Sequence, residues 1–371
     1  MEKPTIDRYF EAVQDPRHHN RLHRLMDIIL IAICAVVSGA DTYEQIGNFA
    51  KKRKSWLSKF LELPRGIPSH DTIGRVFERI DPQEFQSSFK LWIASVTEET
   101  GGQVIAIDGK TLRRSHDQSK DKKAIHMISA WASANQVVLG QLKTDEKSNE
   151  TTAIPYLLKL LDISGCIVTI DAGGAQKKIA GTILDRGGDY VLALKENQKN
   201  LYKDAKLFFD KMDDFDPEEF SFDCHETVDS GHGRMETRTY YITSDIDWLA
   251  DKDKWPGLKS LGMVDSTRKI KGKISRQRRY YVSSLECGAK KFGQAVRSHW
   301  GIENSVHWVL DIAFREDESR IRTGHAPENL AALRHIALNL LKKNQSFKGS
   351  IKTKRLNAAM DVQYLEEVMF S

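Results

Sequence analysis

Three carboxylates in this 371-residue sequence follow patterns that could hold divalent metal ions. Two of them, Asp108 and Asp171, come directly after the apolar runs 104–107 and 167–170, and small residues follow each of them. Ligand sites in open α/β sheets gather at the carboxyl ends of strands, so the two side chains converge if their strands are neighbours. The alternative that each Asp only begins a turn fits the pattern equally well.

Glu303 supplies the third carboxylate. It fills the one polar position in an otherwise apolar stripe along an expected helix over 290–314. A charged side chain that faces a core is costly unless something pairs with it. A divalent cation shared with Asp108 and Asp171 would supply that partner, and three carboxylates suit Mg²⁺ or Mn²⁺. The alternative is a buried salt bridge from Glu303 to Arg297 or Lys195.

The same helix carries polar side chains every four residues, at His299, Glu303, His307 and Asp311. Steps of four over three turns drift by about 120° on a helix of 3.6 residues per turn, so one zinc ion cannot reach all four. We expect His307 to orient Glu303 or to contact a phosphate, and a structural histidine fits equally well. Gly109-Lys110-Thr111 resembles a phosphate-binding loop, but Val104 stands where that loop needs Gly, which argues against a nucleotide triphosphatase.

A dense basic stretch indicates a polyanionic partner. Seven of the twelve residues 268–279 are Lys or Arg, and none is acidic. Clustered unneutralised charge gains most from a DNA backbone, so Arg276, Arg278 and Arg279 are predicted DNA contacts. The alternative is an exposed hairpin loop. The run Lys51–Lys54 is open to the same two interpretations, and the net charge of +5 permits DNA binding without requiring it.

Apolar periodicity predicts the elements that position these residues. Helices are expected over 25–37, 46–60 and 73–92, with Ser69 or Asp71 as a cap for the third. Strands are expected over 104–108, 124–133, 136–144, 167–171 and 190–194, with helices over 150–161 and 176–186 between the later ones. This order indicates an α/β fold whose first three strands are antiparallel and whose later strands are parallel. Strand-like segments follow at 235–243, 261–264 and 279–284, and then helices over 290–314 and 328–343.

Composition places the chain among soluble globular proteins, with 40% hydrophobic and 29% charged residues. Its four cysteines are scattered, which argues against a disulfide framework or a Cys-rich zinc site and favours a reducing cytoplasm. The apolar run 26–40 is about five residues short of a bilayer span, so a buried helix is expected and no membrane partner.

The motifs around these residues resemble those of insertion-sequence DDE transposases of the H-repeat-associated kind. The resemblance covers about residues 5–345. It rests on IAIDGKTLR (105–113), AIHMISAWAS (124–133), LKTDEKSNETTAIP (142–155), TIDAGGAQ (169–176), YVLALKENQ (190–198) and HWGIENSVHWVLD (299–311).

The resemblance implies a ribonuclease-H-like fold, with a mixed five-stranded sheet flanked by helices. It implies five segments: a helical N-terminal domain (1–97), the first part of the core (98–195), an inserted β-rich domain (196–285), the last part of the core (286–345) and a tail (346–371). It also implies cleavage of double-stranded DNA at transposon ends, strand transfer into target DNA, and a homodimer assembled on that DNA. Asp108 would bridge two Mg²⁺ or Mn²⁺ ions, with Asp171 and Glu303 each holding one.

The sequence departs from the pattern of related transposases on the last helix. Val296, His299 and Leu310 stand where relatives carry Tyr, Arg and Lys, and Arg297 is the expected replacement for that Arg. We therefore expect Lys195, Arg297 and His307 to contact DNA together with the basic stretch. Beside Asp171, similar members often carry a bulky residue in place of Gly173 and Cys or Thr in place of Ala175, which motivates one alternative, a decayed transposase that only binds DNA. A second alternative keeps the fold and is a nuclease that cuts without joining.

Overall fold

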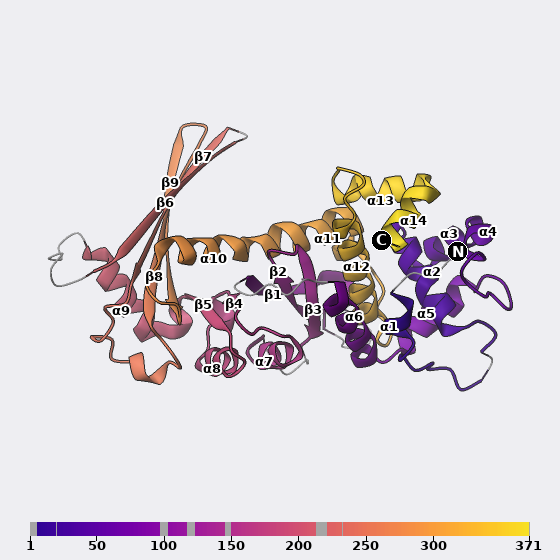
Figure 1. The fold of residues 1–371 in the computed structure, drawn as a ribbon, viewed down its shortest axis with the longest axis horizontal. Coiled ribbons are helices and arrows are strands. Elements are labelled where there is room, and N and C mark those ends of the chain that lie inside the picture. Colours follow the sequence, from indigo (N-terminus) through magenta and orange to yellow (C-terminus); the bar gives the residue numbers. More distant parts are fainter. Residues whose placement is uncertain are drawn as a thin grey trace.

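The computed structural model describes residues 6–19, 21–96, 103–116, 123–144, 150–212, 221–231 and 233–370. The molecule is elongated (Figure 1). A helical end carries both termini, a sheet flanked by helices occupies the middle, and a β arm projects from the other end. The expected boundary at residues 97 and 98 lies outside the described residues.

One mixed sheet of nine strands runs through the middle and into the arm, in the order β3-β2-β1-β4-β5-β9-β8-β7-β6. The strands are β1 (Val104–Leu112), β2 (Ile125–Ala132), β3 (Val137–Lys143), β4 (Ile167–Ile170), β5 (Asp189–Leu194), β6 (Asp223–Gly231), β7 (Arg234–Thr243), β8 (Ser260–Ile270) and β9 (Lys273–Ser283). The pairings of β1 with β2 and of β2 with β3 are antiparallel, and those of β1 with β4 and of β4 with β5 are parallel. These directions confirm the expected order of the first five strands.

The sheet is larger than the five strands expected. Strand β9 pairs antiparallel with β5 over Val191–Leu194, so the strands of segment 196–285 extend the same sheet. Strands β8 and β9 form a hairpin whose turn, Lys271 and Gly272, has positive φ angles at both positions. The right-handed twist of the strands favours such a turn. Both strands of the hairpin are long, so its turn lies at the far end of the projecting arm (Figure 1). Segment 196–285 is thus a continuation of the central sheet.

Helices cover both faces of the central strands because the side chains of a strand alternate. On one face, Ile105, Ile107 and Val168 pack against α7 (Glu150–Leu160) and α8 (Lys177–Asp185). On the other face, Val104 and Ile167 pack against α10 (Ala289–Ile302). Beyond them, α9 (Lys199–Asp210) lies at the base of the arm (Figure 1).

The N-terminal helices form the other large core. They are α1 (Asp7–Phe10), α2 (Leu25–Val37), α3 (Tyr43–Lys52), α4 (Lys54–Leu57), α5 (His70–Arg79) and α6 (Pro82–Val96). Helix α2 has the predicted bounds, and Ser69 is confirmed as the cap of α5 because its side chain accepts from the Thr72 N–H. The single helices predicted over 46–60 and 73–92 are wrong: each is divided in two, the second before Pro82, because Pro favours the first turn of a helix.

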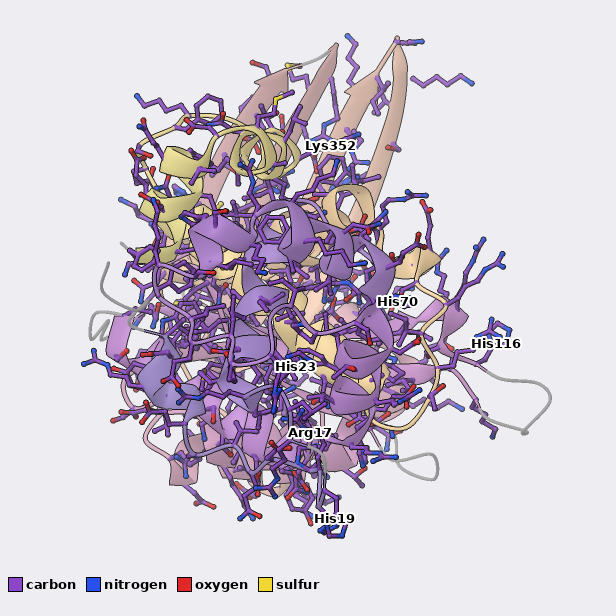
Figure 2. All side chains as sticks on the ribbon, turned by 90° about the vertical axis from the view of Figure 1, so that its right-hand side faces the viewer. Arg17, His19, His23, His70, His116 and Lys352 are labelled. Atoms are coloured by element: carbon purple, nitrogen blue, oxygen red, sulfur yellow. The ribbon has the colours of Figure 1, made fainter. Side chains whose placement is uncertain are left out.

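The apolar run that resembled a membrane segment is buried in this core. Residues Ile28–Val37 are almost inaccessible, and the buried Asp27 carboxylate accepts from the Leu63 N–H. Two basic residues that precede the run, Arg17 and Arg21, form ion pairs with Asp15. Figure 2, viewed from this end, shows His19 at the margin of the molecule. Among the described residues, no helix is long and apolar enough to cross a membrane.

The helix expected over 290–314 crosses the sheet with an irregular centre. It consists of α10, a π-helical turn η7 (Glu303–His307) and α11 (Trp308–Phe314). After a short 3₁₀ turn η8 (Glu316–Glu318), helix α12 (Ala326–Lys343) packs against α2, α5 and α6. The last helices, α13 (Ile351–Met360) and α14 (Val362–Phe370), fold back onto α2 and α12.

Candidate active site

Asp108 and Asp171 are neighbours across the β1–β4 pair. The parallel register ends at Ile107 opposite Ile170, so the two aspartates are the next residue on each chain. Neighbouring strands lie about 4.8 Å apart, which places both residues at one sheet edge. The prediction that β1 ends at Asp108 is wrong, because the strand continues to Leu112 opposite β2, with Asp108 across from Ser129.

Backbone N–H groups close in sequence donate hydrogen bonds to both carboxylates. The Gly109 N–H donates to Oδ1 of Asp108 at 2.9 Å, and the Gly174 N–H donates to Oδ1 of Asp171 at 3.4 Å. The second bond belongs to a 3₁₀ turn, η3 (Ala172–Gly174), that Asp171 caps. Asp171 thus begins a turn, as the alternative proposed, whereas Asp108 lies within a strand that continues past it. Both lie at the shared edge of β1 and β4.

Glu303 lines the same cleft as the two aspartates. The cleft has a volume of about 760 Å³ and lies between the edge of β4 and β5, the base of β9 and helix α10. Its walls include Asp108, Asp171, Glu303, Lys195, Glu196, Arg278, Arg279, His299 and Trp300. The three predicted carboxylates therefore border one space, although nearly two hundred residues separate the first from the last.

The expectation that Glu303 is buried in an apolar stripe is wrong. Its side chain is exposed, whereas Val296, Val306 and Leu310 are buried as expected. Glu303 lines the open cleft, so its carboxylate faces this space where the stripe predicted a packed core. In the described part of the chain Glu303 pairs with neither Arg297 nor Lys195, and Arg297 lies 3.4 Å from Oδ2 of Asp229 in β6.

The electrostatics of the cleft favour a cation. Burial raises the pKa of Asp108 to about 7; the Gly109 N–H opposes this, and the negative charges of Asp171, Glu150 and Glu303 add to it. A divalent cation would relieve this repulsion, and the oxygen ligands suit Mg²⁺ or Mn²⁺. Within the described ranges, no three His, Cys, Asp or Glu side chains are already arranged to hold a metal ion.

The four polar residues on the long helix reach different partners. Nδ1 of His299 lies 3.1 Å from Oγ1 of Thr169, and Nδ1 of His307 lies 3.4 Å from Oδ2 of Asp108. Asp311, one turn further, pairs with Lys110. This separation agrees with the prediction that one ion does not hold all four. His307 lies beside Asp108, whereas the sequence had placed it beside Glu303.

Comparison with known proteins decides the family. The family model described as "Transposase DDE domain" matches residues 99–340, and that described as "DDE_Tnp_1-associated" matches residues 8–93. The chain belongs to the DDE transposase family. It is similar to "Putative transposase YncI" of Escherichia coli O157:H7, at 43% identity over 98% of this chain and 94% of the relative. It is also similar to "H repeat-associated putative transposase YhhI" of Escherichia coli K12, at 41% identity over 100% of this chain and 98% of the relative.

Among solved structures, this DDE transposase family member has a distant match to a piggyBac transposase in a synaptic complex with hairpin DNA. The TM-score is 0.45 at 12% sequence identity, with 98% of this chain and 76% of the other covered.

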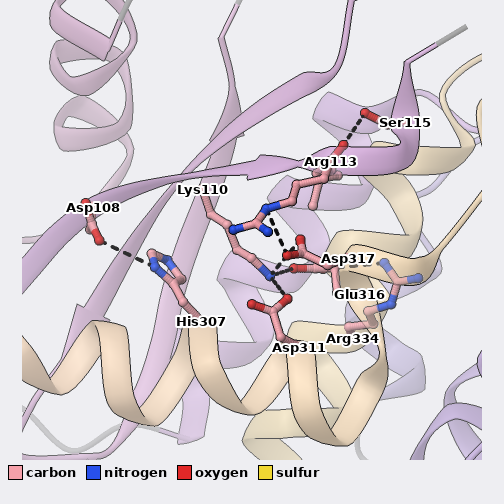
Figure 3. A network of polar contacts seen from close by, with 10 residues as sticks. Asp108, Lys110, Arg113, Ser115, His307, Asp311, Glu316, Asp317 and Arg334 are labelled. Carbon is pink, nitrogen blue, oxygen red and sulfur yellow. Dashed lines mark hydrogen bonds and ion pairs between the residues drawn. The ribbon is translucent and has the colours of Figure 1, made fainter.

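Lys110, two residues after Asp108, holds β1 of this family member against the long helix. Its ammonium pairs with Asp311 and lies 2.9 Å from Oε2 of Glu316 and 3.8 Å from Oδ1 of Asp317 (Figure 3). Burial alone would raise the pKa of Glu316, but the positive charges of Lys110 and Arg334 lower it to about 2. The lysine of the Gly-Lys-Thr sequence is therefore part of a buried ion network, which agrees with the exclusion of a triphosphate-binding loop.

Acidic side chains outside the basic stretch 268–279 neutralise part of its positive charge. Both Arg276 and Arg278 pair with the buried Asp265 of β8, at 2.5 and 3.0 Å, and Arg278 also pairs with Asp210. The interpretation of the stretch as unneutralised charge is wrong for these two residues, because the facing strand supplies the acid. Arg279 instead lies over the ring of Trp300, 4.5 Å from its centre, in the wall of the cleft.

Sequence reasoning overlooked Glu150, which lies near Asp108 and Asp171, and its partner His126. The Nε2 atom of His126 lies 2.7 Å from Oε1 of Glu150, and its Nδ1 lies 2.9 Å from Oγ1 of Thr111. A signal was available, because Glu150 begins a helix of the expected α/β order and His126 lies in a strand that pairs with β1.

Proposed function

We propose that this chain is a metal-dependent transposase that cuts DNA at the ends of a transposable element and joins the freed 3′-hydroxyl to target DNA. The observation that carries the proposal is that Asp108, Asp171 and Glu303 line one cleft. The family membership supports it, because it fixes the class of protein independently of the geometry. The order and directions of β1 to β5 support a ribonuclease-H-like core for the catalytic part.

Asp108, Asp171 and Glu303 would hold two Mg²⁺ or Mn²⁺ ions. When bound, two such ions supply an activated attacking oxygen and a stabilised leaving oxygen for in-line displacement at phosphorus. The protein positions Asp108 through the Gly109 N–H and Asp171 through the η3 turn. Nδ1 of His307 lies 3.4 Å from Oδ2 of Asp108, where it would orient that carboxylate.

The DNA would enter along the cleft and the arm, as two protomers assemble on the transposon ends. Lys195 and Arg279 line the cleft, where their positive charges suit the phosphates on either side of a scissile bond. Arg276 and Arg278 are less suited to this role, because Asp265 already neutralises them. Arg297 lies near Asp229 at the arm, and His307 is buried beside Asp108, so we assign them no direct phosphate contact.

Plasmid cleavage by the purified protein tests the proposal. The plasmid carries the reading frame with its flanking DNA, and Mg²⁺ is added to wild type, Asp108→Asn and the exposed surface control Asp185→Asn. We expect cleavage by wild type and the control, and a loss of at least about 100-fold in Asp108→Asn. Undiminished cleavage by Asp108→Asn would remove the assignment, and binding without cleavage by wild type would favour the decayed remnant.

A second assay separates transposition from simple cutting. A DNA end with a pre-cut 3′-hydroxyl is incubated with target plasmid, and joined products are measured. Joined products with wild type support strand transfer. Cleavage in the first assay without joining in the second would instead assign the chain as a nuclease.

A further inference from the structure

The carboxylate of Glu150 lies between the two glycines that follow the paired aspartates. A Cβ atom at Gly173 would lie 3.2 Å from Oε2 of Glu150 and 3.3 Å from Oδ1 of Asp171. A Cβ atom at Gly109 would overlap Oε1 of Glu150. The absence of side chains at both positions therefore gives the Glu150 carboxylate its place beside Asp108 and Asp171.

A second observation is that His126 and Thr111 hold the carboxylate of Glu150 in one orientation. Thr111 and His126 are opposite each other in the β1–β2 register, and the Thr111 hydroxyl lies 2.9 Å from Nδ1 of His126. If that hydroxyl donates, the neutral ring carries its proton on Nε2 and donates it to Oε1 of Glu150 at 2.7 Å. Among the described residues, Oε2 has no comparable partner, and it is the oxygen on the side of Gly173 and Asp171.

We propose that Glu150 is a fourth metal-binding carboxylate of this centre, oriented by His126 and Thr111. The assignment rests on the proposed metal-dependent function and deepens it. Glu150 comes from α7, on the face of the sheet opposite α10, so the centre would receive oxygen ligands from both sides of the β1–β4 edge. The negative charge of Glu150 also acts on Asp108, as that of Asp171 does. Carboxylates that bind a metal ion are themselves hydrogen-bonded by surrounding residues, and His126 would do this for Glu150.

Calorimetric titration with Mn²⁺ alone, without DNA, tests the assignment. The variants are Glu150→Gln, which keeps the shape and the acceptor for His126 but removes the charge, and Glu150→Asp, which keeps the charge. The control is Glu44→Gln, because Glu44 is also an acidic residue in the first turn of a helix, α3, and is exposed. We expect Glu150→Gln to weaken Mn²⁺ binding by about tenfold or more, Glu150→Asp to retain more affinity, and the control to match wild type.

A second pair of variants tests the placement of Glu150 without removing any charge. Gly109→Ala puts a methyl group where Oε1 of Glu150 lies, whereas Gly231→Ala meets no atom within 4 Å. We expect weaker Mn²⁺ binding in the first and unchanged binding in the second. Thermal unfolding without metal is measured for every variant, so that a loss of folding is recognised.

The possible results separate this assignment from the proposed function. If Glu150→Gln binds Mn²⁺ like wild type while Asp108→Asn binds it weakly, the fourth ligand is rejected and the metal-dependent function stands. A variant that only melts at lower temperature, with unchanged Mn²⁺ affinity, would assign Glu150 a structural role and also reject the proposal. If wild type itself binds no Mn²⁺, the assignment and the metal-dependent function both fail.

Discussion

His307 and Asp108 connect the long helix to the central strand: Nδ1 of the histidine lies 3.4 Å from Oδ2 of the aspartate (Figure 3). Burial lowers the pKa of His307 to about 4, and the positive charge of Lys110 acts in the same direction. The ring is therefore neutral at pH 7, and within the described residues its Nε2 has no hydrogen-bond partner. A neutral ring that carries its proton on Nδ1 would donate to Asp108 and orient that carboxylate.

Replacing His307 with Phe removes this donor and keeps a buried ring of similar shape. We expect Mg²⁺-dependent plasmid cleavage to fall about 10- to 100-fold, because residues that orient a metal ligand typically contribute that much. The protein should remain folded. Cleavage rate and thermal unfolding are measured together, with the exposed His70→Phe as the control.

The pH profile offers a further check on His307. Because its folded pKa is near 4, its protonation should not reduce cleavage between pH 8 and pH 6. A drop near pH 6.5 that disappears in His307→Phe would contradict the neutral ring.

Replacing Glu316 with Gln tests the buried ion network around Lys110. Glu316 is almost fully buried, with Lys110 and Arg334 as its partners, so the variant removes the carboxylate that pairs with the buried Arg334 and leaves Lys110 with Asp311 and Asp317. We expect the free energy of unfolding at pH 7 to fall by about 3–5 kcal/mol, measured by urea denaturation. The exposed Glu318→Gln, which loses only a surface pair with Arg315, should change little.

The same carboxylate gives a pH dependence of defined sign. Its folded pKa of about 2 lies below the ordinary value of 4.5, so its stabilising contribution is present above about pH 4.5 and is lost as the pH falls toward 2. Wild type should therefore lose more stability than Glu316→Gln over that range. Parallel stability curves for the two proteins would contradict the ion network.

Local sequence pattern predicts much of the central sheet and two of the three proposed catalytic carboxylates, Asp108 and Asp171. The sequence predicts that Asp108 and Asp171 lie close together, because the same pattern of apolar strand, carboxylate and small residues occurs twice. Parallel strands end at the same edge of a sheet, which brings the two carboxylates together. The helical stripe indicates Glu303, but its predicted burial is wrong, because helical periodicity does not show that a cleft lies beside the helix.

Contacts between distant segments were beyond such reasoning. The neutralisation of Arg276 depends on Asp265 in the facing strand, and that register is fixed only by the whole β8–β9 hairpin. Glu150 was missed because its relation to Gly109 and Gly173 requires the crossing of α7 over the sheet. Local pattern therefore gives the elements, while the partners of charged side chains require tertiary structure.

The arm offers a test of DNA contact that separates free charge from paired charge. Lys269, Lys271 and Lys273 are exposed at the tip of the β8–β9 hairpin. If each contacts a phosphate, replacing all three with Gln should reduce the slope of log K against log salt concentration by up to about 2.7, since each contact contributes about 0.9. DNA binding is measured by fluorescence anisotropy at several salt concentrations.

Arg276→Gln is the matched comparison for those lysines. Asp265 already serves as its counter-ion, so we expect a smaller change in slope than for Lys273→Gln alone. An unchanged slope in the triple lysine variant would exclude the tip of the arm from the DNA interface.

Arg355 shows that the segment expected to be a tail is part of the fold. From α13, its buried guanidinium donates to the carbonyl oxygens of Val36 and Ala313, and it pairs with Asp41 at 2.9 Å. One side chain thus ties the ends of α2 and α11, and α11 continues the helix that carries Glu303.

Replacing Arg355 with Met keeps much of the apolar volume but removes the donor to the Ala313 carbonyl and the cation beside Asp41, while the Val36 carbonyl keeps the Gly39 N–H. Each group left unpaired costs about 1–3 kcal/mol. We expect a loss of at least about 2 kcal/mol in the free energy of unfolding, measured by urea denaturation, whereas the exposed neighbour Lys352→Met should be nearly neutral. Because α11 would also lose its anchor, cleavage should fall at temperatures where the variant is still folded. If Arg355→Met matches wild type in both stability and cleavage, the C-terminal helices do not support the active site.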